Sequence, residues 1–109
     1  MPKKIKTIFV VSTIHLSTKE IAGKSYEFPH ARAVGWFSNE AAAKKIIIEN
    51  HGNIYEVGHY PFAVIEETEE WLYPDIVKEI WFKWDNKKEK YIEVNKPRRF
   101  KKYIGFGIS

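Results

Sequence analysis

The sequence contains no cysteine among its 109 residues. This absence excludes a disulfide framework, a thiolate nucleophile and every zinc site that uses cysteine ligands. The chain has only 5 prolines and 6 glycines against 44% hydrophobic and 16% aromatic residues, so it has enough apolar side chain to fold, unlike a disordered polar segment. Its length is that of one compact domain, and we expect residues 1–109 to form a single domain with one hydrophobic core.

Long hydrophobic runs are also missing. No window approaches the roughly 18 apolar residues that a membrane-spanning helix needs. Lysines precede the apolar run Ile8–Val11 as they would in a signal peptide, but the run is short and β-branched. His15 and Lys19 follow where a cleavage site would need small residues. We therefore expect a cytoplasmic protein, in the host cell if a phage encodes it, with no membrane partner.

The positive charge of the chain is concentrated near its end. The formal net charge is +4, which favours anionic partners mildly. The segment Lys96–Lys102 holds five cations and no acid, so the rest of the chain is close to neutral. An acidic run, Glu66–Glu70, has the opposite sign; it either pairs with the basic segment or lies in solvent.

The first third of the chain predicts two strands and a loop. Ile5–Ile14 is almost continuously apolar and β-branched, which indicates a central strand covered on both faces. Ser17–His30 is polar and irregular, which predicts a long functional loop holding at most a short turn or edge strand. Ala31–Phe37 resumes strand character, and Gly35 indicates a bulge or a close approach by another backbone or a ligand.

One helix is predicted next. Ser38 is a suitable N-cap, Ala41–Asn50 is rich in helix formers, and Gly52 supplies the stop. The apolar side of this helix should pack on one face of the sheet, with Lys44, Lys45 and Glu49 in water. That side contains Ala42, Ala43, Ile46, Ile47 and Asn50.

The second half predicts a strand and a hairpin. Tyr60–Glu67 is apolar enough for a strand, and the bulky segment Trp71–Pro74 needs a cover. Lys78–Trp84 and Lys90–Val94 alternate around a turn, as in a β-hairpin. We expect Ile80, Phe82, Trp84, Ile92 and Val94 on one hairpin face, Trp81 and Lys83 on the other, then a basic helical turn at Arg98–Ile104 and an extended tail, Gly105–Ser109. The predicted fold class is α+β, a single antiparallel sheet of four to five strands with one main helix packed on one face.

Catalytic and metal motifs are scarce. The four histidines never fall at the i, i+4 spacing of a helical metal site, so we predict no metal, no cofactor and no enzymatic activity. His15-Leu16-Ser17 matches one copy of the His-x-Ser/Thr pattern of two-histidine phosphoesterases, but the chemistry needs two copies and no second copy occurs. No nucleophile elbow, Walker loop or dinucleotide fingerprint is present.

The sequence does bring aromatic and cationic residues together. Aromatic faces stack on bases for about 1 to 3 kcal/mol each, and guanidinium groups bind phosphate oxygens in pairs. Arg32 stands out because it lies among small apolar residues at the start of a strand, whereas any single aromatic residue is more often part of a core or an interface than of a ligand site. The candidate ligand-binding residues are Ser17, Thr18, His30, Arg32, Trp36, Trp71, Tyr73, Lys83, Arg98 and Arg99. Ser17 and Thr18 would close over the ligand as part of the loop.

Several segments carry a resemblance to a known group. They are Arg32–Phe37, Asn53–Glu56, Ala63–Glu67, Leu72–Pro74, Trp81–Trp84 and Phe106–Ile108. Across nearly the whole chain, these segments resemble a family of short, uncharacterised phage and prophage proteins. Proteins of this kind include viral sponges, which sequester the cyclic oligonucleotides or ADP-ribose derivatives that bacterial defence systems use as immune signals. The resemblance implies a homo-oligomer whose Arg32 loop and basic tail contact phosphates, although no motif identifies the ligand.

Two other functions remain open. A phage accessory protein would dock on a host protein through the aromatic segment Glu70–Pro74. Alternatively, Lys96–Lys102 would bind nucleic acid without sequence preference and with a strong salt dependence, which the acidic run argues against. We expect replacement of Arg32 by alanine to abolish ligand binding with little change in melting temperature.

Overall fold

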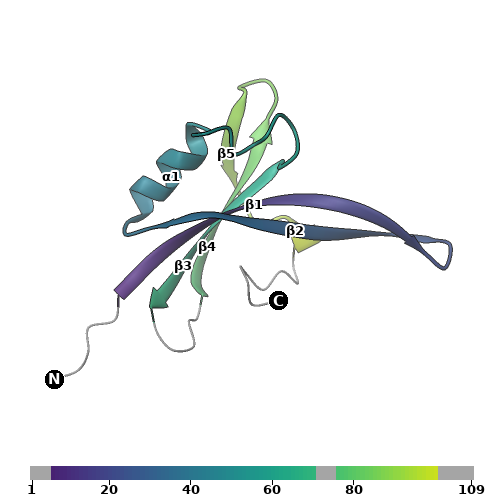
Figure 1. Cartoon of the computed structure of the whole chain (residues 1–109), viewed down its shortest axis with the longest axis horizontal. Coiled ribbons are helices and arrows are strands. Elements are labelled where there is room, and N and C mark those ends of the chain that lie inside the picture. Colours follow the sequence, from purple (N-terminus) through teal and green to yellow (C-terminus); the bar gives the residue numbers. More distant parts are fainter. Residues whose placement is uncertain (1–5, 71–75, 101–109) are drawn as a thin grey trace.

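The computed structural model describes residues 6–70 and 76–100 (Figure 1). Within these residues, a single antiparallel sheet has the strand order β2-β1-β3-β4-β5. The strands are β1 (Lys6–Ile21), β2 (Lys24–Phe37), β3 (Phe62–Glu70), β4 (Ile76–Asp85) and β5 (Lys90–Val94), accompanied by helix α1 (Glu40–Ile48) and the short 3-10 helix η1 (Arg98–Phe100). The predicted α+β class, with one antiparallel sheet and one main helix, is confirmed.

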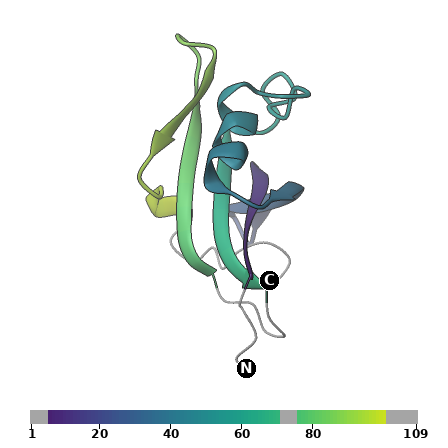
Figure 2. The ribbon, with the colours of Figure 1, turned by 90° about the vertical axis from the view of Figure 1, so that its left-hand side faces the viewer.

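Both faces of the sheet carry a core. On the face covered by α1, Ala43 and Ile47 of the helix pack with Val11 and Ile65 of the central strands (Figure 2). On the other face, Phe100 of η1 joins a second cluster with Ile14, Phe62, Val64 and Trp81. The central strands therefore bury side chains in both directions, which explains the unbroken apolar run predicted for the first strand.

The helix begins one residue later than predicted. Asn39, and not Ser38, is the N-cap: its backbone is extended and its side-chain oxygen accepts a 2.8 Å hydrogen bond from the backbone N–H of Ala42. Both residue types are good caps, so only the exact phase of the helix decides between them. Lys78 of β4 also forms an ion pair with Glu40 in the first turn, at 3.0 Å. The helix is thus fastened to the sheet at its start as well as along its apolar side.

The predicted loop at Ser17–His30 is wrong. These residues continue β1 and β2 as a two-stranded arm, the long hairpin that leaves the rest of the sheet in Figure 1. β3 pairs with β1 only as far as Ile14, whereas β2 pairs with β1 as far as Ile21. We define the arm as residues 15–30. Its tip is a tight turn at Ala22 and Gly23, both with positive φ, 54° and 80°.

A bulge lies at the base of the arm, as the sequence predicted near Gly35. Val11 pairs with Gly35 and Ser12 pairs with Ala33, so Val34 is the extra residue of β2. A β-carbon on Gly35 would meet only the ring of Phe37, at 3.9 Å. Gly35 therefore marks the bulge and not a close approach by another backbone.

The β4–β5 hairpin is confirmed, but part of its predicted facing is wrong. Directly opposed residues of an antiparallel pair share a face, and Trp81 lies opposite Val94 while Lys83 lies opposite Ile92. Ile92 and Val94 therefore share the face of Trp81 and Lys83, opposite to Phe82. The length of the turn after Asp85 sets this register, and alternation within each strand does not reveal it.

Some predictions fall outside the described residues. These are the aromatic segment Trp71–Pro74, the helical turn beyond Phe100 and the tail Gly105–Ser109. In the parts that are described, no helix is long and apolar enough to cross a membrane.

Candidate functional site

The two faces of the arm differ in charge. Strand pairing places Lys19 opposite Tyr26, and Lys24 opposite Ile21, on the face that continues the α1 side of the sheet. Glu20 and Glu27 fall on the reverse face by the same alternation. We call the face that carries Lys19 and Lys24 the cationic face. Its side chains come from β1 (His15, Ser17, Lys19, Ile21) and β2 (Lys24, Tyr26, Phe28, His30, Arg32).

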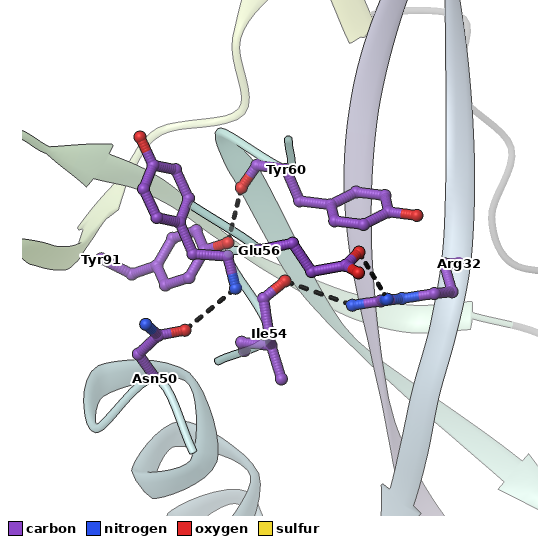
Figure 3. Close-up of polar contacts among 7 residues, drawn as sticks. Arg32, Asn50, Ile54, Glu56, Tyr60 and Tyr91 are labelled. Carbon is purple, nitrogen blue, oxygen red and sulfur yellow. Dashed lines mark hydrogen bonds and ion pairs between the residues drawn. The ribbon is translucent and has the colours of Figure 1, made fainter. Parts of the chain in front are cut away.

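The loop between α1 and β3, residues 49–61, covers the base of the cationic face (Figure 3). The backbone N–H of Tyr55 donates to the side chain of Asn50 at 2.9 Å, and the ring of Tyr55 stacks on Trp84 with centroids 3.8 Å apart. Tyr91 donates its hydroxyl to the backbone carbonyl of Tyr60. These contacts tie the loop to the helix and to the β4–β5 hairpin.

The loop has an unusual backbone. Glu56, Val57 and Gly58 are successive residues with positive φ, at 50°, 51° and 99°. Left-handed geometry is costly for a β-branched residue, so other contacts must compensate at Val57. The contacts of Glu56, described next, lie directly beside it.

Arg32 joins β2 to this loop. Its Nη1 forms a 2.8 Å ion pair with Glu56, and its Nη2 donates to the backbone carbonyl of Ile54 at 3.2 Å. The guanidinium carbon also lies 4.3 Å from the centre of the Tyr60 ring, a cation–π distance. Figure 3 shows the Arg32 side chain reaching from the strand to the loop, with Tyr60 beside it. The segments Arg32–Phe37 and Asn53–Glu56 therefore meet at this contact.

Three histidines lie close together beside Tyr60. The rings of His15 and His59 stack, with centroids 4.4 Å apart and planes 13° from parallel, and His30 lies 5.4 Å from His15. The Oγ atom of Ser17 is 2.7 Å from Nε2 of His30. Tyr60 meets His59 edge-on at 4.6 Å. We call His15, His30 and His59 the histidine cluster.

One member of the histidine cluster, His15, has a lowered pKa. Partial desolvation, followed by the nearby His59 and His30, lowers the pKa of His15 below its ordinary value of 6.5. Stacked imidazoles keep their nitrogen lone pairs in nearly parallel planes, so these lone pairs do not converge on one point. Consistently, the described residues contain no group of three or more His, Cys, Asp or Glu side chains arranged to hold a metal ion.

The structure brings together three of the predicted site residues. Ser17, His30 and Arg32 all lie on the cationic face, within strands. Ser17 and Thr18 do not form a loop that closes over a ligand, because both belong to β1 and point to opposite faces of the arm. The prediction of a closing loop is therefore wrong, and the cationic face is an open surface of two strands.

The other predicted site residues lie elsewhere. Trp36 is 64% exposed but pairs with Val10, on the face opposite to Arg32. Lys83 shares its face with Trp81, and Arg98 is exposed in η1, which packs on that same side. Trp71, Tyr73 and the side chain of Arg99 are outside the described part of the chain.

Sequence reasoning missed Glu56 and Tyr60 as partners of Arg32, and His59 as the stacking partner of His15. Part of the cationic face was visible in the sequence. Its side chains from β2 occupy alternate positions, as on one face of a strand: Tyr26, Phe28, His30 and Arg32. The turn hid the pattern, because Ala22 occupies a left-handed position that glycine or asparagine usually signals. The loop residues carry no local signal that places them over β1 and β2.

Comparisons of the chain with protein families, with curated proteins and with solved structures find no match.

Proposed function

We propose that this protein binds a small anionic nucleotide on the cationic face of its arm and releases it unchanged. One observation carries the proposal: the charged side chains of the arm sort by sign between its two faces. Lys19 and Lys24 share one face of the arm, and Glu20 and Glu27 lie on the other. Arg32, ion-paired with Glu56, continues the cationic face at the base of the arm. Segregation of this kind creates a local positive potential that a chain with a formal net charge of only +4 would not otherwise provide.

The same face offers rings for a base. Tyr26 is 44% exposed, and its ring lies 6.5 Å from that of Phe28. Lys19 stands 6.0 Å from the centre of the Phe28 ring, so a cation lies beside the aromatic surface. A base stacked on such a surface gains about 1–3 kcal/mol. The arm thus combines a stacking surface with a positive charge at a spacing that suits a nucleotide.

Arg32 has capacity left for a phosphate. A guanidinium carries five N–H donors, and the contacts with Glu56 and Ile54 are one each from Nη1 and Nη2. Its side chain is 40% exposed. Arg32 can therefore keep the loop in place and still donate to an incoming phosphate.

Binding without cleavage is part of the proposal. The Ser17–His30 contact has the length of a nucleophile–base pair. Within the described residues, however, no carboxylate hydrogen-bonds His30 to orient it, as a catalytic base requires. The ligand class we propose is that of the family resemblance, cyclic oligonucleotides or ADP-ribose derivatives, held by a homo-oligomer.

A thermal-shift screen tests the proposal. The purified protein is mixed with cyclic dinucleotides, cyclic trinucleotides and ADP-ribose derivatives, since a ligand at 100 times its Kd adds about 2.7 kcal/mol of stability. We expect one class to raise the melting temperature and to be recovered intact after denaturation. Light scattering with and without that ligand measures the oligomeric state.

Matched variants locate the site. Tyr26→Ala should weaken binding at least tenfold, whereas Trp36→Ala removes an exposed aromatic ring from the opposite face and should leave the affinity unchanged.

A cleaved ligand in the screen would show that the protein is an enzyme instead. No shift with any compound would favour a protein-binding role, which capture of one stoichiometric host partner, unaffected by nucleotides, would establish.

A further inference from the structure

Among the residues that the structure describes, the histidine cluster has no acidic ion-pair partner. Glu56 is the nearest acid that the loop contributes, and it is held by Arg32 at 2.8 Å. The acids of the arm, Glu20 and Glu27, lie on the reverse face. Within the described residues, no ion pair joins a carboxylate to His15, His30 or His59.

The groups around His15 are either neutral or cationic. From β2 it faces His30 and, farther along, Arg32; from the loop it faces His59 and Tyr60, with Glu56 beyond Tyr60 on Arg32. From its own strand it is followed on the same face by Ser17 and Lys19. Adding protons to this cluster therefore creates positive charge with no internal counter-ion.

We propose that His15, His30 and His59 form a subsite for a tetrahedral oxyanion, a phosphate group of the ligand, and that the subsite fills with uptake of protons. This inference rests on the proposed function and adds to it where the phosphate lies and how pH controls its affinity. A protonated imidazole has two N–H donors for the anion, whereas a neutral imidazole has one N–H donor and one lone pair that repels the anion. The hydroxyl of Ser17, 2.7 Å from His30, can donate to the neutral ring or accept from the protonated one.

Anion binding and protonation of the histidine cluster favour each other. In the empty site, desolvation and the neighbouring rings hold the pKa of His15 down. An anion at the edges of the rings reverses the second of these effects, because it attracts each added proton. By linkage, a ligand that raises the proton affinity of the cluster must itself bind more tightly at low pH.

Sulfate is the probe of choice for the test. It is a tetrahedral dianion whose charge stays constant between about pH 5.5 and pH 8, so any pH dependence belongs to the protein. Isothermal titration in EDTA, in two buffers of different ionisation enthalpy, gives both the Kd and the number of protons taken up. Between pH 8 and pH 5.5, we expect the Kd for sulfate to fall by a factor of about three to ten for each proton that binds together with the anion. We expect at least one proton to be taken up.

Variants separate the histidine cluster from the general charge. His15→Gln and His59→Gln should each flatten the pH dependence of the Kd. His51→Gln is the matched control, because His51 is exposed in the turn after α1 and contacts no other histidine in the described residues. Circular dichroism at both pH values confirms that each variant is folded.

The outcomes distinguish this inference from the proposed function. A sulfate Kd that is independent of pH, or a pH dependence that survives both cluster variants, would overturn the subsite. Sulfate binding that requires a metal, absent in EDTA and present with added zinc, would overturn it as well. Nucleotide binding that does not depend on pH would remove the subsite and leave the proposed function standing; pH-dependent sulfate binding without any nucleotide ligand would do the reverse.

Discussion

β1 and β2 run continuously through two different environments. At the base, Val11 and Ile14 of β1 are fully buried between α1 on one side and η1 with its neighbours on the other. In the arm, every residue from 18 to 27 is exposed, and the β1–β2 ladder with a few cross-strand side-chain contacts holds the strands together. A two-stranded ribbon of this kind is only marginally stable in water. The base therefore provides the stability of the fold, and the arm provides accessible surface.

The difference also appears in how polar groups are used. At the base, polar contacts fasten elements to each other, as Asn39 does for α1 and Arg32 does for the loop. On the arm, Lys19, Lys24 and Tyr26 point outward on one face without fastening any element. Polar side chains that do not stabilise the fold are available for a ligand.

The largest expected effect is a loss of unfolding free energy when the base of the sheet is altered. Ile47→Ala removes a fully buried side chain between α1 and the sheet and should cost about 2–5 kcal/mol of unfolding free energy. Ile21→Ala, at the exposed tip of the arm, should cost about 0.5 kcal/mol or less. Urea denaturation of both variants measures the contrast. Equal losses would mean that the arm tip is buried in solution, for example against a second copy of the chain.

An intermediate effect is expected where the two regions meet. Arg32→Ala removes an ion pair, a hydrogen bond and a cation–π contact, all partly exposed, and should cost about 1 kcal/mol. The contacts thus replace the expectation of an unchanged melting temperature with a modest loss. Arg32→Lys keeps the charge without the two-pronged geometry, so it should recover part of the ligand affinity but little of the stability. Thermal unfolding and ligand titration of both variants give the two readings, and full recovery of stability by lysine would show that charge alone holds the loop.

The smallest effect is a pH dependence that belongs to the arm. The unfolded chain, in which the pKa of His15 returns to its ordinary 6.5, binds more protons below that pH than the native protein does. The contribution of neutral His15 to stability is therefore present above about pH 6.5 and is lost as the pH falls through that value toward the lowered pKa. Unfolding midpoints between pH 5 and pH 8 should rise with pH and rise less steeply in His15→Gln. The same slope in the variant would assign the effect to other groups, and His51→Gln should match the wild type.

The sequence predicted the base of the fold better than the arm. Strongly apolar or alternating segments, such as Ile5–Ile14 and Lys78–Trp84, read correctly as strands because burial imposes a pattern on them. The arm buries almost nothing, so its residues carry no such pattern, and Ser17–His30 reads as a loop. Of the site, Arg32 and His30 were found from composition. Glu56, the partner of Arg32, was not found, because a loop with left-handed residues brings it there from 24 residues away.

Pro29 gives the outer edge of the arm a further property. β2 is an edge strand, and its pairing with β1 runs through Pro29, opposite Leu16, without a shift in register. Proline has no N–H, so an uninterrupted ladder requires its nitrogen to point away from β1, toward the open edge. Another strand that tried to add to this edge would find no donor at that position. The single proline ring thus disfavours edge-to-edge association of this long exposed strand with another sheet, and it leaves both faces of the arm uncovered.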